Sequence, residues 1–386
     1  MKHAFSVIII FLMLIPATAG AQELSYFGSV KLDSAWHHAE NAVADPVLPW
    51  HGLTDWQTAA LTVEADLRLT LETVMFRVHQ DLSFDQEAQF TYRLLEGYAS
   101  FTPVGPLTIT VGRRHLSWGT GIFFFPADKL NPIALDPSTA RRDQGFPGVA
   151  VTLSPSSDFT MVAAVSFEDS LQHATDEFFR DFRYGIIFSL LVGPLNVKTD
   201  LIYQADRVFR PGGGFTLDLG GFIFFAEAAV ELNNRILYPS SPLAWSERPL
   251  LTPFPSVEAG VRRSFSAGDA TFFLAAEYLY AGDGFTAQEK DWFFQAPGGA
   301  PVPEHLGRHY LFFQASVSLE HVFSTEHGVL WNAQDGSILF SHRLTLLAVD
   351  NLDLFAEGLW TVGGTDTEFG ATGERLRLTA GAVFYF

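Results

Sequence analysis

The last residues of the chain, RLRLTAGAVFYF (375–386), decide the fold that we expect. Side chains along a β-strand point alternately to its two faces. Here Leu, Ala and Phe occupy every even-numbered position from 376 to 386, while Arg375, Arg377, Thr379 and Tyr385 share the other face. An apolar face suits lipid, and charged residues suit a water-filled interior. The segment therefore predicts a strand of a membrane-spanning β-barrel.

The same alternation recurs along the whole chain. Apolar residues at 61, 63, 65, 67 and 69 alternate with polar ones, and residues 311–320 repeat the pattern. Short connections, such as 103–106, 192–194 and 220–221, alternate with long ones, such as 36–53, 114–146, 234–253 and 282–307. Short periplasmic turns and long extracellular loops are typical of antiparallel up-and-down outer-membrane barrels. We expect an all-β barrel of about 18 strands, with 16 as the alternative because the number should be even.

The composition agrees with a barrel and excludes other classes of protein. Of the 386 residues, 48% are hydrophobic and only 17% are charged, against about 25% charged in average proteins. No long apolar run follows the first residues, which argues against a helical membrane protein. The absence of cysteine excludes disulfide and zinc–thiolate chemistry. The net charge of −19 argues against a nucleic-acid partner.

Residues 1–21 have the features of a Sec signal peptide. Lys2 and His3 precede an apolar core at 7–15, and Ala19-Gly20-Ala21 forms an A-x-A cleavage site. We therefore expect cleavage near Ala21 and a mature barrel of residues 22–386, located in the outer membrane of a Gram-negative bacterium. No cysteine follows the site, so a lipoprotein is not expected.

One connection, VGRRHLSWGTGIFFFPADKLNPIALDPSTARRDQGFP (111–147), is too rich in Gly and Pro for one helix or strand. Loops of this length usually have a function. We expect the loop at 114–147 to fold into the barrel and narrow the pore; the alternative is a cap held together by Arg–Asp pairs. Phe123-Phe124-Phe125 would form either an apolar constriction or a small loop core. The residues expected to narrow the pore are Arg113, Arg114, Trp118, Asp128, Asn131, Asp136, Arg141, Arg142 and Asp143.

Two motifs resemble those of bacterial outer-membrane proteins. The pattern G-R-x4-W-G followed by P-x-D-x-x-N-P is similar to one in several porin-like, largely uncharacterised barrel families. The terminal Phe386 resembles the C-terminal signal that the barrel-assembly machinery reads in Gram-negative bacteria. The resemblance implies a pore or export barrel. The loop pattern is carried by Gly112, Arg113, Trp118, Gly119, Pro126, Asp128, Asn131, Pro132 and Arg142.

Charged residues opposite the apolar faces are expected to line the lumen. Ten are acidic and six are basic, which predicts a mild cation preference; the alternative is that they only form cross-strand ion pairs. The set comprises Glu64, Asp66, Arg68, Arg77, Asp81, Glu96, Lys198, Asp200, Glu227, Glu231, Glu258, Arg262, Glu277, Glu320, Arg375 and Arg377.

The leading functional prediction is a porin-like channel for passive diffusion of small polar solutes. The alternative is a substrate-specific barrel for hydrophobic compounds, suggested by Ile223 and Phe225 on the inward face, or for polysaccharide export. A structural or adhesive barrel is less favoured. An enzyme is not expected, because His115, Ser117 and Asp128 supply residue types but no triad geometry. We expect no cofactor and no metal. The expected partners are outer-membrane lipids, the assembly machinery and small solutes. A homo-oligomer is open, since no stretch identifies an interface.

Overall fold

The protein is described by a computed structural model. It describes residues 23–39, 55–86, 89–116, 118–126, 128, 145–167, 182–204, 208–232, 237–241, 244–247, 252–295, 305–320, 322–371 and 373–386. The expected signal peptide at 1–21 and much of the loop at 114–147 lie outside these residues. None of the helices among them has the length and apolar character needed to span a membrane.

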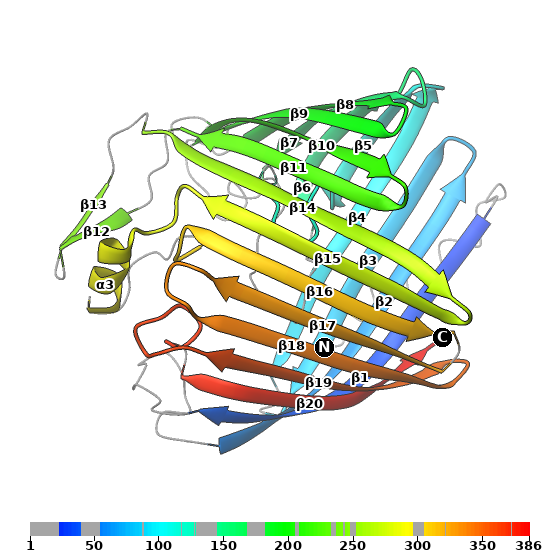
Figure 1. The fold of residues 1–386 in the computed structure, drawn as a ribbon. Coiled ribbons are helices and arrows are strands. Elements are labelled where there is room, and N and C mark those ends of the chain that lie inside the picture. The colour runs from blue at the N-terminus through cyan, green and yellow to red at the C-terminus, as the bar shows by residue number, and fades with distance from the viewer. Residues whose placement is uncertain are drawn as a thin grey trace.

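The chain forms a closed antiparallel barrel of 18 strands (Figure 1). Each strand of the barrel pairs with the next barrel strand along the chain, β11 with β14, and β1 pairs with both β2 and β20, which closes the sheet. The expectation of 18 strands is confirmed, and the alternative of 16 is not. The strands are β1 (Glu23–Ala39), β2 (Asp55–Leu71), β3 (Val74–Asp85), β4 (Phe90–Val104), β5 (Leu107–Arg114), β6 (Phe146–Leu153), β7 (Phe159–Ser166), β8 (Arg183–Val192), β9 (Leu195–Gln204), β10 (Val208–Leu219), β11 (Phe222–Glu231), β14 (Phe254–Ala267), β15 (Ala270–Ala281), β16 (His309–Leu319), β17 (Phe323–Asn332), β18 (Ile338–Val349), β19 (Leu352–Val362) and β20 (Glu374–Tyr385).

The long connections gather at one end of the barrel and the short turns at the other (Figure 1). A hairpin of β12 (Leu237–Ser241) and β13 (Ala244–Glu247) and the helix α3 (Ala287–Gln295) lie at the long-loop end. The helix begins with a capping box. Thr286 Oγ1 accepts a hydrogen bond from the Glu289 N–H at 3.2 Å, and the Glu289 carboxylate accepts one from the Thr286 N–H at 2.8 Å.

The wall has an apolar outer face and a largely polar inner face. Outward side chains such as Leu32, Phe76 and Leu378 are exposed, whereas the inward Glu96 and Glu277 are buried. Closure of the 18-stranded sheet leaves that sheet without an edge strand. The alternation of the sequence thus becomes the two faces of the wall.

Two boundaries differ from the sequence prediction. We expected residues after Trp36 to form a loop, but β1 continues to Ala39 because it pairs there with both β2 and β20. We expected Glu320 on a lumen-lining strand, but β16 ends at Leu319 and Glu320 lies exposed in the following turn.

A β-bulge shifts the alternation in β4. His79 of β3 pairs with Glu96, but the next residue, Gln80, pairs with Leu94, so one residue of β4 is inserted. A bulge re-aims the side chains on either side of it. Arg93 and Glu96 consequently both bond to inward residues of β3, although their spacing would place them on opposite faces of a regular strand.

Candidate functional site

The loop that follows β5 begins at the inner face of β4 and continues inside the barrel. The His115 N–H donates a hydrogen bond to Glu96 Oε1 at 2.9 Å. Trp118, only 1% exposed, packs against inward apolar residues of β6 to β9, including Phe146, Ile187 and Ile202. Burial of the Trp118 side chain therefore fixes the first turn of the loop against β6 to β9.

Carboxylates farther round the wall, on β11 and β15, hold the next residues. Glu277 of β15 accepts hydrogen bonds from three consecutive backbone N–H groups, those of Ile122 at 3.2 Å, Phe123 at 3.0 Å and Phe124 at 2.8 Å. Glu227 of β11 accepts one from the Thr120 N–H at 2.8 Å. Hydrogen bonds to ionised acceptors are the strong ones. The segment 119–124 is thus anchored by its backbone, and its side chains remain available for packing.

A third carboxylate lies beneath the segment. Glu258 of β14 pairs in register with Glu227 and is fully buried. A Cβ on Gly121 would come within 2.3 Å of Glu258 Oε1 and 2.0 Å of the Phe124 carbonyl oxygen. Only glycine therefore allows the loop to cross this carboxylate.

The aromatic run packs on the wall. The ring of Phe123 stacks on Phe312 of β16, with 4.4 Å between ring centroids. Phe124 is buried in a cluster with inward residues of β15 to β19, among them Leu279, Leu330 and Leu339. Phe123 and Phe124 thus pack against the wall strands as well as against each other. The rings also cover the apolar inner patch that the wall would otherwise expose.

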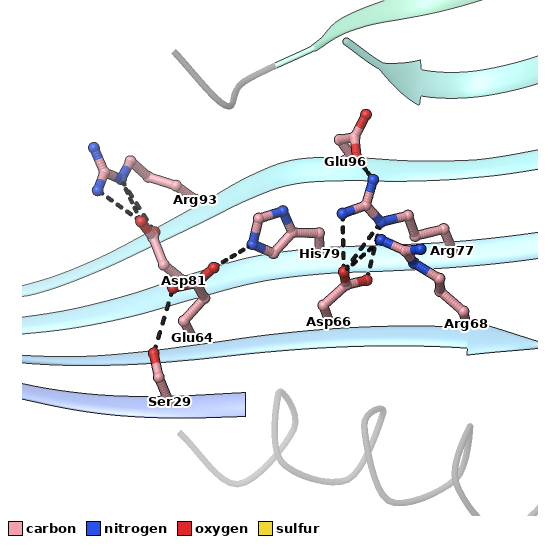
Figure 2. A network of polar contacts seen from close by, with 9 residues as sticks. All are labelled: Ser29, Glu64, Asp66, Arg68, Arg77, His79, Asp81, Arg93 and Glu96. Atoms are coloured by element: carbon pink, nitrogen blue, oxygen red, sulfur yellow. Dashed lines mark hydrogen bonds and ion pairs between the residues drawn. The ribbon is translucent and has the colours of Figure 1, made fainter. Parts of the chain in front are cut away.

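The facing wall, formed by β2, β3 and β4, carries a charged network (Figure 2). Arg77 is central to it. Its guanidinium donates to Asp66, with 2.8 Å between Nη2 and Oδ2, and also to Glu96. Arg68 Nη2 reaches Asp66 at 3.3 Å. Arg77 of β3 therefore joins carboxylates of the two strands that flank it, β2 and β4.

Two further pairs extend the network along these strands (Figure 2). His79 Nε2 lies 2.6 Å from Glu64 Oε1, and Arg93 Nη2 donates to Asp81 Oδ2 at 2.6 Å. Figure 2 shows basic and acidic side chains interspersed over β2, β3 and β4. The wall is densely charged yet nearly neutral overall, which keeps it hydrated without a strong field of one sign.

The remaining loop residues of the predicted constriction lie partly at the end of β5. Arg113 Nη1 donates to the Gly145 carbonyl oxygen at 2.7 Å, which ties the two ends of the loop together. Arg114 lies over the Tyr98 ring, with 5.1 Å from its guanidinium carbon to the centroid, and bonds Thr110. Asp128 is buried. The residues Ser117, Asn131, Asp136, Arg141, Arg142 and Asp143 lie outside the described part of the chain.

Four of the other predicted lumen residues have partners of their own. Lys198 Nζ donates to the Gly119 carbonyl oxygen at 3.2 Å, so it holds the loop from β9. Asp200 is buried on the same strand. Glu231 pairs with Arg210 at 2.7 Å, Arg377 with Glu374 at 2.9 Å, and Arg375 bonds the Gly363 carbonyl oxygen at 2.6 Å. Arg262 lies on β14 in register with Ile223 and Ala275.

Sequence reasoning missed several of these partners. The inward direction of Arg93 was not predicted, because the bulge in β4 shifts the alternation of side chains. His79, Arg210 and Glu374 were on the polar faces of their strands, but only the register of neighbouring strands shows which carboxylate or arginine each one meets. Among the described residues, no group of three or more His, Asp or Glu side chains is arranged to hold a metal ion.

At the long-loop end, Glu368 ties three connections together. Its Oε2 accepts hydrogen bonds from the Tyr310 hydroxyl at 2.6 Å and from Asn332 Nδ2 at 2.7 Å. Its own N–H donates to Asp335 Oδ2 at 2.9 Å, and Lys290 of α3 lies 3.2 Å from that oxygen. The network thus links α3 and the β17–β18 turn to the β19–β20 loop.

We expect this network to weaken as pH rises. Burial raises the pKa of Glu368 from 4.5 to about 7. Because the folded value lies above the unfolded one, the stabilisation is fully present below pH 4.5 and is lost as pH rises through about 7. The shift corresponds to about 3 kcal/mol. Thermal unfolding at pH 5 and pH 9 should show the difference, and Glu368→Gln, which keeps the shape without the charge, should remove most of it. An unchanged pH dependence in that variant would contradict the assignment.

Comparisons with known proteins place the fold. No protein-family model and no curated protein matches the chain. Among solved structures, OccAB1 of Acinetobacter baumannii has a TM-score of 0.59 at 10% identity, over 96% of this chain and 98% of that chain. A BenF-like porin from Pseudomonas fluorescens Pf-5 has 0.55 at 9%, over 95% and 100%. OccK2 (OpdF) of Pseudomonas aeruginosa, solved in complex with glucuronate, has 0.54 at 10%, over 96% and 100%. At these identities the likeness is one of fold.

Proposed function

We propose that the chain is an outer-membrane channel for passive diffusion of small polar solutes. In this proposal the loop at 114–147 narrows its lumen. The observation that carries the proposal is the segment 119–124, held inside the barrel by Glu227 and Glu277 opposite the charged wall of β2 to β4. A solute crossing the barrel would pass between these two surfaces. Export through a Sec signal peptide and an outer-membrane location are parts of the same proposal.

The polar lumen supports small hydrophilic solutes over hydrophobic ones. Arg77, His79 and Arg93 present hydrogen-bonding groups along one wall. The apolar patch on the other wall is covered by Phe123 and Phe124, so within the described part of the chain it offers no continuous apolar path. The glucuronate bound to OccK2, a barrel of similar fold, is a small polar solute of the size that we propose here.

The test is the single-channel conductance of the refolded mature protein in a planar bilayer. We compare the wild type with a variant lacking residues 122–142 and with a control variant lacking the hairpin at 237–247, which lies at the barrel end (Figure 1). We expect an open wild-type channel, a severalfold larger conductance without the loop segment and no change without the hairpin. Absence of conductance in all three folded proteins would refute the channel. Equal conductance with and without the loop segment would refute its narrowing role.

A further inference from the structure

Two histidines interrupt the apolar outer face of the barrel. His327 and His342 are paired in register, each at the fifth position of its strand, β17 or β18. Their sequence neighbours Gly328 and Ser341 meet on the inner side, where Phe312 also lies, so the alternation directs both imidazoles outward. His327 is exposed and His342 half-buried. The pair therefore lies near the middle of the outer wall.

An imidazole pair is costly at this place. The next outward residues along the two strands are Val329 and Trp331 on β17, and Phe340 and Leu344 on β18. If the barrel spans a membrane, as our proposed function requires, this face meets lipid tails, which offer no hydrogen bonds. Ionisable residues inside the membrane are rare and mark functional sites.

The pair forms a short chain of hydrogen bonds with a nearby threonine. His342 Nδ1 lies 2.9 Å from His327 Nδ1, and His327 Nε2 lies 3.2 Å from Thr325 Oγ1. We consider the pair with both rings neutral, since even one imidazolium charge facing lipid tails would be costly. Each neutral ring then donates through one nitrogen and accepts through the other.

The hydrogen-bonded series Thr325–His327–His342 has one polar group left over at each end, a donor at one end and an acceptor at the other. If His342 Nδ1 donates to His327, then His327 Nε2 donates to Thr325, which leaves the Thr325 hydroxyl hydrogen as a donor and His342 Nε2 as an acceptor. If all donors are reversed, His342 Nε2 becomes the donor and Thr325 Oγ1 the acceptor. Among the described residues, neither end has a further hydrogen-bond partner. In both directions the unit carries one donor and one acceptor at its ends.

The neighbours of the pair are small. In register with His327 on β16 is Ala315, and in register with His342 on β19 is Gly358, which is buried beside the side chains of Leu378 and Trp360. Two residues farther along β18 and β19, Leu344 pairs with Ala356, which is exposed. Small residues allow two polypeptides to approach closely within a membrane, where packing and hydrogen bonds drive association.

We propose that this patch, defined as Ala315, Thr325, His327, His342 and Ala356, is a self-association surface on which a second copy of the chain docks about a two-fold axis. A two-fold interface brings the same patch together from both copies. The donor at one end of each hydrogen-bonded chain then meets the acceptor at the other end of the second copy's chain, twice by symmetry. Lipid tails cannot supply either group.

The association is measured in lipid nanodiscs and liposomes. The chain has no cysteine, so Leu344→Cys places one thiol beside the histidine pair, in register with Thr325 and Ala356. A short bismaleimide is the cross-linker, because copper oxidation would bring a metal to the imidazoles. Ala226→Cys on β11, on the outer face next to inward Phe225 and Glu227, is the control. We expect cross-linked dimers from Leu344→Cys and none from Ala226→Cys at equal protein-to-lipid ratios.

The hydrogen-bonded chain is tested by His327→Leu combined with His342→Leu, and separately by Thr325→Val. Each should weaken dimerisation by about tenfold to a hundredfold and leave the conductance of each barrel unchanged, since the patch faces outward. A conducting wild type that stays monomeric at every protein-to-lipid ratio overturns the proposal. So does a dimer that survives the leucine variant, or one that a chelator dissolves, which would indicate a metal bridge. A barrel that never conducts refutes the proposed function instead.

Discussion

Replacing Glu277 with alanine should release the segment 119–124 from β15 and increase the single-channel conductance. The carboxylate accepts three hydrogen bonds from backbone N–H groups in a buried site. Hydrogen bonds to a charged group contribute about 1.5–3 kcal/mol each, and a buried donor that loses its acceptor costs about 1–3 kcal/mol. The loss of even one such bond changes a local equilibrium about tenfold or more. We therefore expect conductance close to that of the variant lacking 122–142, with more frequent transitions between levels.

The control for Glu277→Ala must remove a lumen carboxylate without touching the loop. Glu326 of β17 serves, because its side chain bonds Gln314 on the neighbouring strand. Glu326→Ala should change the ion selectivity in the same direction as Glu277→Ala but leave the conductance level almost unchanged. Glu277→Gln retains one acceptor oxygen and should give an intermediate result. Equal conductance of Glu277→Ala and the wild type, with both folded, would show that the apolar packing of Phe123 and Phe124 alone holds the segment.

The strands of this barrel are readable from the sequence because each obeys a local rule. Positions 376 to 386 alternate as predicted, and the described β20 carries Leu378 outward and Arg377 inward. The turns are readable for the same reason: Gly193, Gly220 and Gly268 adopt positive φ at short connections, where glycine is favoured. The number of 18 strands can be predicted because each strand and each short turn is recognised from its own residues.

The site is less readable because its contacts are non-local. The alternation of side chains predicted that Glu227 and Glu277 face the lumen. Nothing near them in sequence shows that they accept hydrogen bonds from N–H groups of a loop more than a hundred residues earlier. The bulge that turns Arg93 inward has no sequence signature. The sequence alone did not single out His327 and His342, because their pairing depends on the strand register that brings the two rings together.

Replacing Arg77 with alanine should destabilise the barrel and shift its selectivity toward cations. The guanidinium joins Asp66 and Glu96, whose side chains are 13% and 8% exposed. Removing one partner of a buried ion pair costs about 3–5 kcal/mol; some exposure reduces our expectation to about 2–3 kcal/mol. The lumen also gains one net negative charge, which favours cations. The temperature at which the folded band disappears in gel electrophoresis measures the first effect, and the reversal potential in a salt gradient measures the second.

Arg263 provides the matched control for the loss of one positive charge. It lies on β14 with its guanidinium carbon 4.3 Å from the centroid of the outward Phe222 ring. Arg263→Ala changes the net charge equally, but on the outer face, so the reversal potential should stay near the wild-type value. Arg77→Lys keeps the charge and loses the planar fork that serves two carboxylates at once; it should preserve selectivity while losing part of the stability. A reversal potential that shifts equally in Arg77→Ala and Arg263→Ala would mean that permeating ions do not pass close to the wall of β2 to β4, which would place the conducting path elsewhere in the barrel.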